Sequence, residues 1–200
     1  MGIVDRVKNI LLTPKDEWPV IAGEQTDIKT LYTSYIMLLA AIPAVAGILS
    51  SAMFAGMMGR FGASISIGFI AMGAILGYVL SLIMVYVVAH IADALAPSFD
   101  GEKNFIQSFK LVTYSMTASW VGGILSIIPL LGGLLALLIA LYGAYIFYVG
   151  STTMKNVPEA KAVGYTIVVI IAAIVVGFII GLVTGGIVAM GAVGSVATFR

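Results

Sequence analysis

Long apolar runs alternate with short polar or glycine-rich stretches along this chain. An α-helix needs about 20 apolar residues to cross the hydrocarbon core of a bilayer. On that criterion the pattern predicts five membrane helices, at about residues 28 (or 31) to 53, 65–92, 109–128, 134–149 and 163–190. A turn at residues 128–133 joins the third to the fourth, and it either reaches the outer surface or dips part-way into the bilayer. We therefore predict an all-α integral membrane protein, a bundle of five transmembrane helices.

The amino-terminal 27 residues follow a different pattern. Their first apolar positions, Ile3, Val7 and Ile10 among them, recur at helical spacing between charged residues, which is typical of an amphipathic helix lying in the membrane plane. Thr13 and Pro14 then form a helix start signal. We interpret residues 1–27 as an interfacial segment and residues 28–200 as the membrane helices of a single domain. Docking of a partner protein is the alternative role for this segment.

Composition supports the membrane assignment. Hydrophobic residues make up 61% of the 200 positions and charged residues only 10%, far below the roughly 25% of soluble domains. The chain has no cysteine, which excludes disulfides, thiolate metal sites and cysteine nucleophiles. The longest polar stretch is the amino-terminal one, so the sequence predicts no separate catalytic domain.

The basic residues predict an orientation. In a five-helix plan, only Arg60 and Arg200 of the ten lysines and arginines fall on one side of the membrane, and the other eight fall on the opposite side. In membrane proteins, cytoplasmic loops contain more lysine and arginine than external loops do. We therefore expect a cytoplasmic amino terminus and an external carboxyl terminus. The nine acidic residues lie on the same inner side, where a cytoplasmic protein partner would bind.

Small residues mark two helix faces that can pack closely. They recur every four positions on the second helix, at Gly73, Gly77 and Ser81, and on the fifth, at Gly177, Gly181 and Gly185. Membrane helices associate through such small-residue faces. Two interpretations remain. These faces pack against helices of the same bundle, or they form the contact between two copies in a homo-oligomer. Trp18 is the expected interfacial anchor, because an amphipathic indole is favourable among lipid headgroups.

Few residues suggest chemistry. His90 and Asp93 are three positions apart near the end of the second helix, hence on one face. They are candidate functional or gating residues in a proton relay or half a metal site, and the alternative is a local hydrogen bond near the surface. No Ser-His-acid spacing, phosphate loop or dinucleotide fingerprint is present, and the basic residues are too scattered for nucleic acid. We predict no catalytic residue, no cofactor and no metal site.

Several short motifs, in this order, resemble those of the Yip1 domain family in its compact bacterial form. They are Thr13-Pro14 with Trp18 and Ile21, Asp100-Gly101 with Phe105 and Phe109, Tyr114-Ser115, Ile128-Pro129-Leu130-Leu131-Gly132, the aromatic segment 142–150, and Val157-Pro158-Glu159 with Lys161-Ala162. The resemblance implies a polytopic protein of the cytoplasmic (inner) membrane of a bacterium, with a cytoplasmic amino terminus. Eukaryotic relatives bind Rab-type small GTPases and act in vesicle traffic. Those relatives carry a long cytoplasmic amino-terminal region that is absent from this sequence. Many members have a proline where this chain has Thr117-Ala118-Ser119.

Two functions follow as hypotheses. The first is a non-enzymatic scaffold or adaptor for membrane lipids or partner proteins, acting alone or as a homo-oligomer. The second is a small transporter, channel or lipid scramblase with a proton- or ion-sensitive face at His90 and Asp93.

Overall fold

The computed structural model describes residues 1–60, 67–127 and 132–197, and within these ranges the secondary structure is entirely helical. Four helices are long and apolar enough to cross a membrane: Ile28–Met57, Ile67–Phe99, Leu134–Lys155 and Glu159–Ile187. The predicted class, an all-α protein with membrane-spanning helices, is therefore confirmed.

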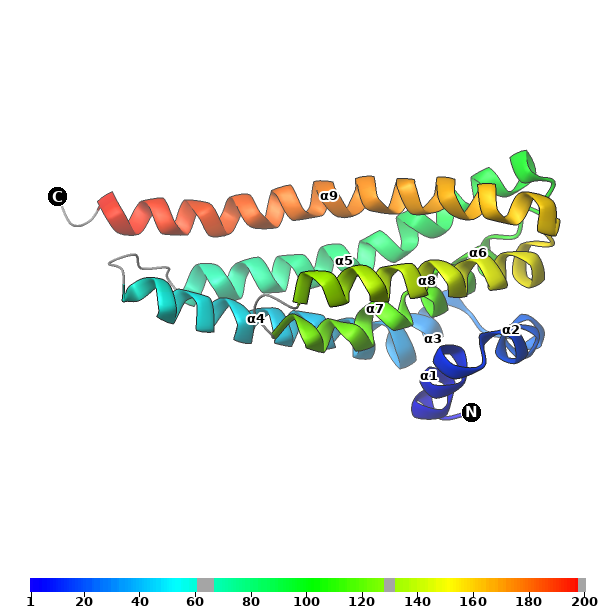
Figure 1. Ribbon diagram of the computed structural model, residues 1–200, viewed down its shortest axis with the longest axis horizontal. Coiled ribbons are helices and arrows are strands. Elements are labelled where there is room, and N and C mark those ends of the chain that lie inside the picture. The colour runs from blue at the N-terminus through cyan, green and yellow to red at the C-terminus, as the bar shows by residue number, and fades with distance from the viewer. Residues whose placement is uncertain (61–66, 128–131, 198–200) are drawn as a thin grey trace.

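The helices form an elongated bundle (Figure 1). Their bounds in chain order are α1 Ile3–Leu12, α2 Pro14–Gly23, α3 Ile28–Leu31, the π-helix Tyr32–Ile36, α4 Met37–Gly59, α5 Ile67–Leu95, the 3-10 helix Ala96–Phe99, α6 Phe105–Ser115, α7 Thr117–Gly122, the 3-10 helix Gly123–Ile127, α8 Gly132–Lys155 and α9 Glu159–Ala197.

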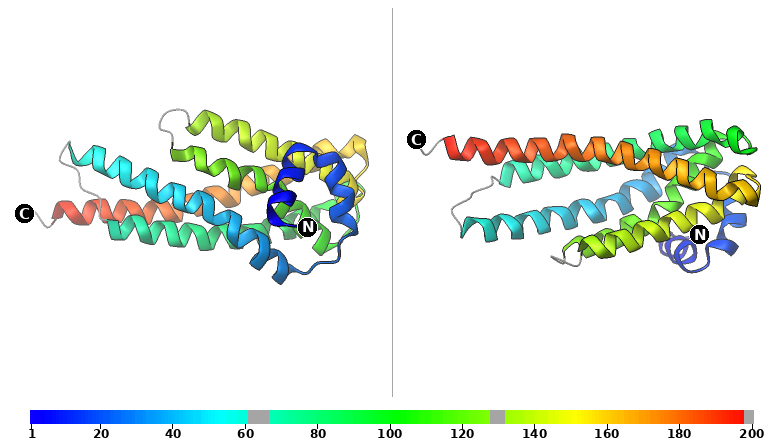
Figure 2. Two further views of the ribbon diagram at one scale, coloured as in Figure 1. Left: turned by 90° about the horizontal axis from the view of Figure 1, so that it is seen from below. Right: turned by 45° about the horizontal axis from the view of Figure 1, so that its top comes forward.

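The two ends of the bundle differ. Helices α1 and α2, which we call the cap, lie against one end together with the turns that lead into α6 and α9, and we call this the capped end (Figures 1 and 2). The last turns of α4, the first turns of α5 and the last turns of α9 lie at the opposite end, the open end. Helices α5 and α9 share the most extensive contact in the bundle.

Local sequence explains where several helices begin. Pro14 occupies the first turn of α2, where its missing N–H costs no helical hydrogen bond. The Asp27 carboxylate caps α3 and accepts a hydrogen bond from the Thr30 backbone N–H at 2.7 Å. Hydrogen bonds from Thr30 also lower the pKa of Asp27. Asn104 caps α6 in the same way, accepting from the Gln107 N–H at 3.3 Å.

The sequence suggested one continuous helix over residues 109–128, and the structure shows that this prediction is wrong. The run is divided into α6, α7 and the 3-10 helix Gly123–Ile127, so four helices rather than five have the length and composition of a membrane span among the described residues. The chain departs from α geometry at Met116 and again after Gly122. Two successive glycines, Gly122 and Gly123, favour the second change because glycine lowers helix stability.

This broken segment and α8 together form a hairpin that covers only part of the bundle length (Figures 1 and 2). Gly123 lies against Pro43, where an added Cβ would approach the proline Cβ to 2.6 Å. Beyond Pro43, α4 continues to Gly59, about 24 Å farther at 1.5 Å per residue. The turn at residues 128–131, whose depth the sequence left open, lies outside the described residues.

Candidate functional site

A buried polar network joins four segments at the capped end. Lys155, at the end of α8, is fully buried and donates from Nζ to Asp93 Oδ1 at 2.7 Å and to the Asn104 carbonyl at 3.0 Å. The same Asp93 oxygen accepts from Ser108 Oγ at 3.0 Å and from the Asn104 N–H at 2.8 Å. Asp93 therefore holds α5, α6, α8 and the turn before α6 in one arrangement.

His90 does not share this environment. Its side chain is exposed, its Nδ1 lies 3.1 Å from the carbonyl of Tyr86, and its ring lies 4.1 Å from that of Phe105, centroid to centroid. Asp93, three residues on, faces the interior. The two residues that the sequence placed on one face thus have different surroundings, because Lys155 and Ser108 bind the carboxylate inside the bundle.

The cap is fixed to the bundle by a second set of buried charges. Arg6 of α1 is 6% exposed and forms ion pairs with Glu17 and Glu24. Its guanidinium carbon lies 5.5 Å from the centre of the Tyr114 ring on α6. Lys110, also on α6, is 2% exposed and donates to the backbone carbonyls of Ile21 and Glu24 at 3.0 and 2.5 Å. These contacts dock the cap on α6.

Trp18 lies in the protein interior. The side chain is fully buried, and its Nε1 donates to the carbonyl of Ile146 on α8 at 3.1 Å. Gly150 makes room for the indole, because a Cβ at that position would lie 2.4 Å from Trp18 Cε2. The expectation that Trp18 faces lipid headgroups is not met, since α2 packs against α8 and covers the indole. Trp18 instead attaches the cap to the bundle.

The small-residue faces are only partly occupied. A Cβ at Gly77 would lie 3.6 Å from Thr184, and one at Gly177 would lie 3.7 Å from Met84, both ordinary contacts between α5 and α9. In the described structure, a Cβ at Gly181 or Gly185 would meet no heavy atom within 4 Å beyond its own helix neighbourhood. Gly73, Gly77 and Gly185 line a cavity of about 430 Å³ between α4, α5 and α9. Ser81 donates to the carbonyl of Tyr78 on its own helix.

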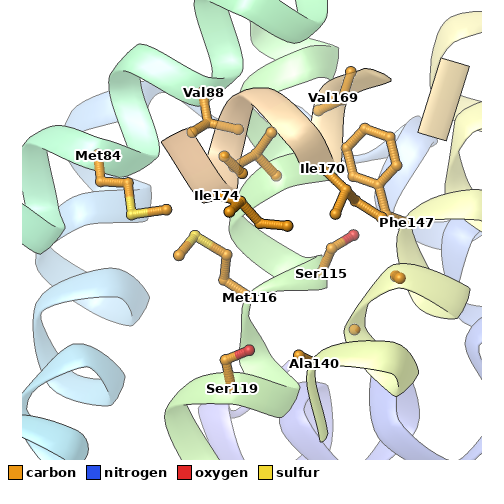
Figure 3. Close-up of a pocket in the computed structure, with 14 residues that line it drawn as sticks. Met84, Val88, Ser115, Met116, Ser119, Ala140, Phe147, Val169, Ile170 and Ile174 are labelled. Atoms are coloured by element: carbon orange, nitrogen blue, oxygen red, sulfur yellow. The ribbon is translucent and has the colours of Figure 1, made fainter. Parts of the chain in front are cut away.

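A second cavity, which we call the central cavity, has a volume of about 320 Å³. Side chains from α5, α6, α7, α8 and α9 line it, and Figure 3 shows Met84, Met116 and Ile174 converging on it from three directions. Its lining is almost wholly apolar. Ser115, which is 6% exposed, is among the few polar side chains in the lining, and its Oγ has no hydrogen-bond partner among the described residues.

The arrangement of charges favours a structural role over chemistry. Within the described ranges, no three His, Asp or Glu side chains gather as a metal site would require. The carboxylates of Asp93 and Glu17 are occupied by Lys155 and Arg6, which leaves neither of them as a free base. Both polar sets fix helices relative to one another.

Sequence reasoning missed Arg6, Lys110 and Lys155, which turn out to be buried. Their neighbours gave one signal: Lys110 and Lys155 each border a long apolar run, where a charge is costly unless it is paired. No spacing rule pairs Lys155 with Asp93, which lies 62 positions away.

Comparison with known proteins identifies one family. The model of the Yip1 domain matches residues 8–181 of the chain. No curated protein and no solved structure matches.

Proposed function

Because the chain belongs to the Yip1 domain family, we propose that it is a non-enzymatic membrane scaffold that organises lipids and partner proteins. The observation that carries this proposal is the cap. Charged helices that merely rested on the lipid surface would not need buried ion pairs, but Arg6 pairs with Glu17 and Glu24 and fixes the parts of the cap to one another. Lys110 and the contact of Arg6 with the Tyr114 ring then tie this segment to α6. A docked cap offers a fixed binding surface, because its conformational entropy is already lost before a partner arrives.

The cap also carries the groups that a protein partner could recognise. Lys8, Lys15 and Asp16 are exposed on it, next to the exposed apolar side chains of Val4 and Leu12. Mixed charges around apolar contacts are typical of protein–protein interfaces. We place this surface in the bacterial cytoplasm because eight of the ten lysines and arginines fall on this side of the membrane in the predicted topology.

The surroundings of His90 and Asp93 count against the alternative of a gated transporter. A gate must exchange protons or ions, whereas Asp93 is held by Lys155, Ser108 and the Asn104 N–H. Opening it would break a buried ion pair.

We propose that five helical segments enter the bilayer, with α6 and α7 counted as one segment. Helices α4, α5 and α9 cross it, and the hairpin of α6–α7 and α8 reaches about half-way. Tyr142 donates to the Leu11 carbonyl, which sets the cap level with that part of α8. From there to Gly132, α8 extends about 15 Å at 1.5 Å per residue, half of the roughly 30 Å hydrocarbon core. An odd number of crossings still separates the termini.

Cysteine labelling tests this placement. A membrane-impermeant maleimide applied to intact cells should label Arg60→Cys but neither Gly2→Cys nor Ile127→Cys. External labelling of Gly2→Cys would overturn the orientation, and labelling of Ile127→Cys as fast as Arg60→Cys would show that the hairpin crosses completely.

The scaffold role itself is tested with a photo-crosslinking amino acid at Lys15 on the cap, compared with the same group at Ile83, an exposed apolar position on α5. In native membranes, Lys15 should give a discrete protein adduct and Ile83 should give lipid adducts. Purified protein in proteoliposomes should conduct no ions and move no lipid faster than empty vesicles. Flux that His90→Ala abolishes, or no protein adduct at Lys15, would contradict the proposal.

Self-association is the part of the proposal that uses α9. The face at Gly181 has no neighbour within the described structure, so a second copy could approach there closely. Gly181→Leu should therefore abolish oligomers in detergent while leaving thermal stability unchanged, and Ile180→Leu should do neither. Loss of stability in Gly181→Leu without a change of oligomer size would assign this face to packing within one chain.

A further inference from the structure

We infer that the central cavity binds one ester-linked acyl chain of a phospholipid, with the Ser115 hydroxyl donating a hydrogen bond to the ester carbonyl. The proposed scaffold organises lipids in general, and this inference goes beyond it by naming one bound acyl chain and its site. Three features of the cavity lead to it: its depth, its lining and the buried hydroxyl of Ser115, which has no partner among the described residues.

The depth of the cavity follows from its neighbours. Tyr114, the residue before Ser115, carries the Arg6 guanidinium over its ring, and Tyr142 on α8 donates to the Leu11 carbonyl of the cap. A charged cap and tyrosine side chains are both characteristic of the membrane–water interface. Ser115 therefore lies at about the level where lipid headgroups give way to acyl chains, which is the level of their ester carbonyls.

The lining suits a hydrocarbon chain. Small residues on α8 and α9, Ala144 and Ala173, leave space where larger ones would close the gap. Exposed side chains at Ala140 and Ile174 border the cavity on the side that leads away from the cap, toward the open end. A volume of about 320 Å³ is within the range of ligand pockets. Water is a poor occupant, because apolar cavities of this kind stay dry.

The Ser115 hydroxyl supplies the polar contact. Ser115 lines the cavity, and its Oγ is buried and has no partner among the described residues. Figure 3 shows this hydroxyl on the side of the cavity bordered by Phe147 and Ile170. Burying a hydroxyl without a hydrogen bond is costly, and a lipid ester carbonyl would satisfy it. The chain attached to that carbonyl would then extend past Met116 toward Ile174.

The experiment uses full-length protein in vesicles of diacyl phosphatidylethanolamine and phosphatidylglycerol, doped with a phospholipid that carries a diazirine in mid-chain. After illumination, mass spectrometry should locate adducts on Met116 and Ile174 well above those on Ile83 and Leu182, exposed apolar positions on α5 and α9 outside the cavity. Ala144→Phe should remove the adducts by filling the cavity, whereas Ala136→Phe, two turns away on the same helix, should not. If Ala144→Phe fails to fold, Ala173→Leu fills the cavity from α9.

The hydroxyl is tested separately by comparing ester-linked with ether-linked probe lipids, which lack the carbonyl. One hydrogen bond corresponds to about a fivefold preference for the ester, and this preference should vanish in Ser115→Ala. Adducts spread evenly over all exposed apolar residues would overturn the inference. A crosslinker at Ala140 that captures a second copy of the chain instead of lipid would also overturn it, whether or not the cap binds its partner.

Discussion

The capped end and the open end are held together by different means. At the capped end, Arg6, Lys110 and Lys155 are buried, and each finds a carboxylate or a backbone carbonyl as partner. At the open end, large side chains such as Met57 and Ile67 are exposed, and part-way along α9 toward that end the face at Gly181 has no neighbour in the described structure.

The difference follows from what surrounds each end. A buried charge that loses its partner is strongly penalised, so paired charges allow only one arrangement of the helices they join. Apolar side chains gain nothing by leaving lipid for another apolar surface, so the open end can leave them exposed to acyl chains. The capped end therefore sets the geometry, and the open end depends on lipid or on further protein to cover it.

The largest expected effect comes from breaking the Asp93–Lys155 pair. Lys155→Met leaves a buried carboxylate uncompensated and should lower the free energy of unfolding by about 3–5 kcal/mol. Unfolding in mild detergent, followed by circular dichroism, measures this loss. The control is Lys161→Met, which breaks the exposed ion pair with Asp100 and should cost about 1 kcal/mol or less. Equal losses in the two variants would show that burial of an ion pair does not decide how much it stabilises the capped end.

A smaller effect is expected from glycine substitutions at the capped end and part-way along α9. Gly150→Ala forces a methyl group against Trp18 and Leu111 and should cost about 1–3 kcal/mol. Trp18 fluorescence should shift to longer wavelength as the cap loosens. Gly181→Ala meets no neighbour and should be neutral, or stabilising by up to about 1 kcal/mol, because alanine favours helix over glycine. Destabilisation by both substitutions would mean that α9 is closely packed along its whole length.

The smallest effect is expected at His90. Because its side chain is exposed and contacts mainly Phe105 and Tyr86, His90→Ala should change the free energy of unfolding by about 0.5 kcal/mol or less. A loss comparable to that of Lys155→Met would place His90 in the network after all.

The amino-acid sequence by itself determined the class and the order of the parts. Apolar runs of membrane-spanning length are a local property, so the helices that became α4, α5, α8 and α9 could be located to within several residues. The helical spacing of Ile3, Val7 and Ile10 likewise indicated a helix where α1 lies. Motif order placed the chain in its family before any contact was known.

Only the tertiary structure decided which polar residues act together. Asp93 had a candidate partner three residues away in His90, yet it binds Lys155 at the end of another helix. Trp18 suited a lipid interface by its chemistry, but α8 offered the Ile146 carbonyl and the space at Gly150. The broken helix after Met116 was equally hidden, because an apolar run has the same composition whether lipid or protein surrounds it. Pairing in a bundle depends on side chains distant in sequence, and no local pattern encodes that choice.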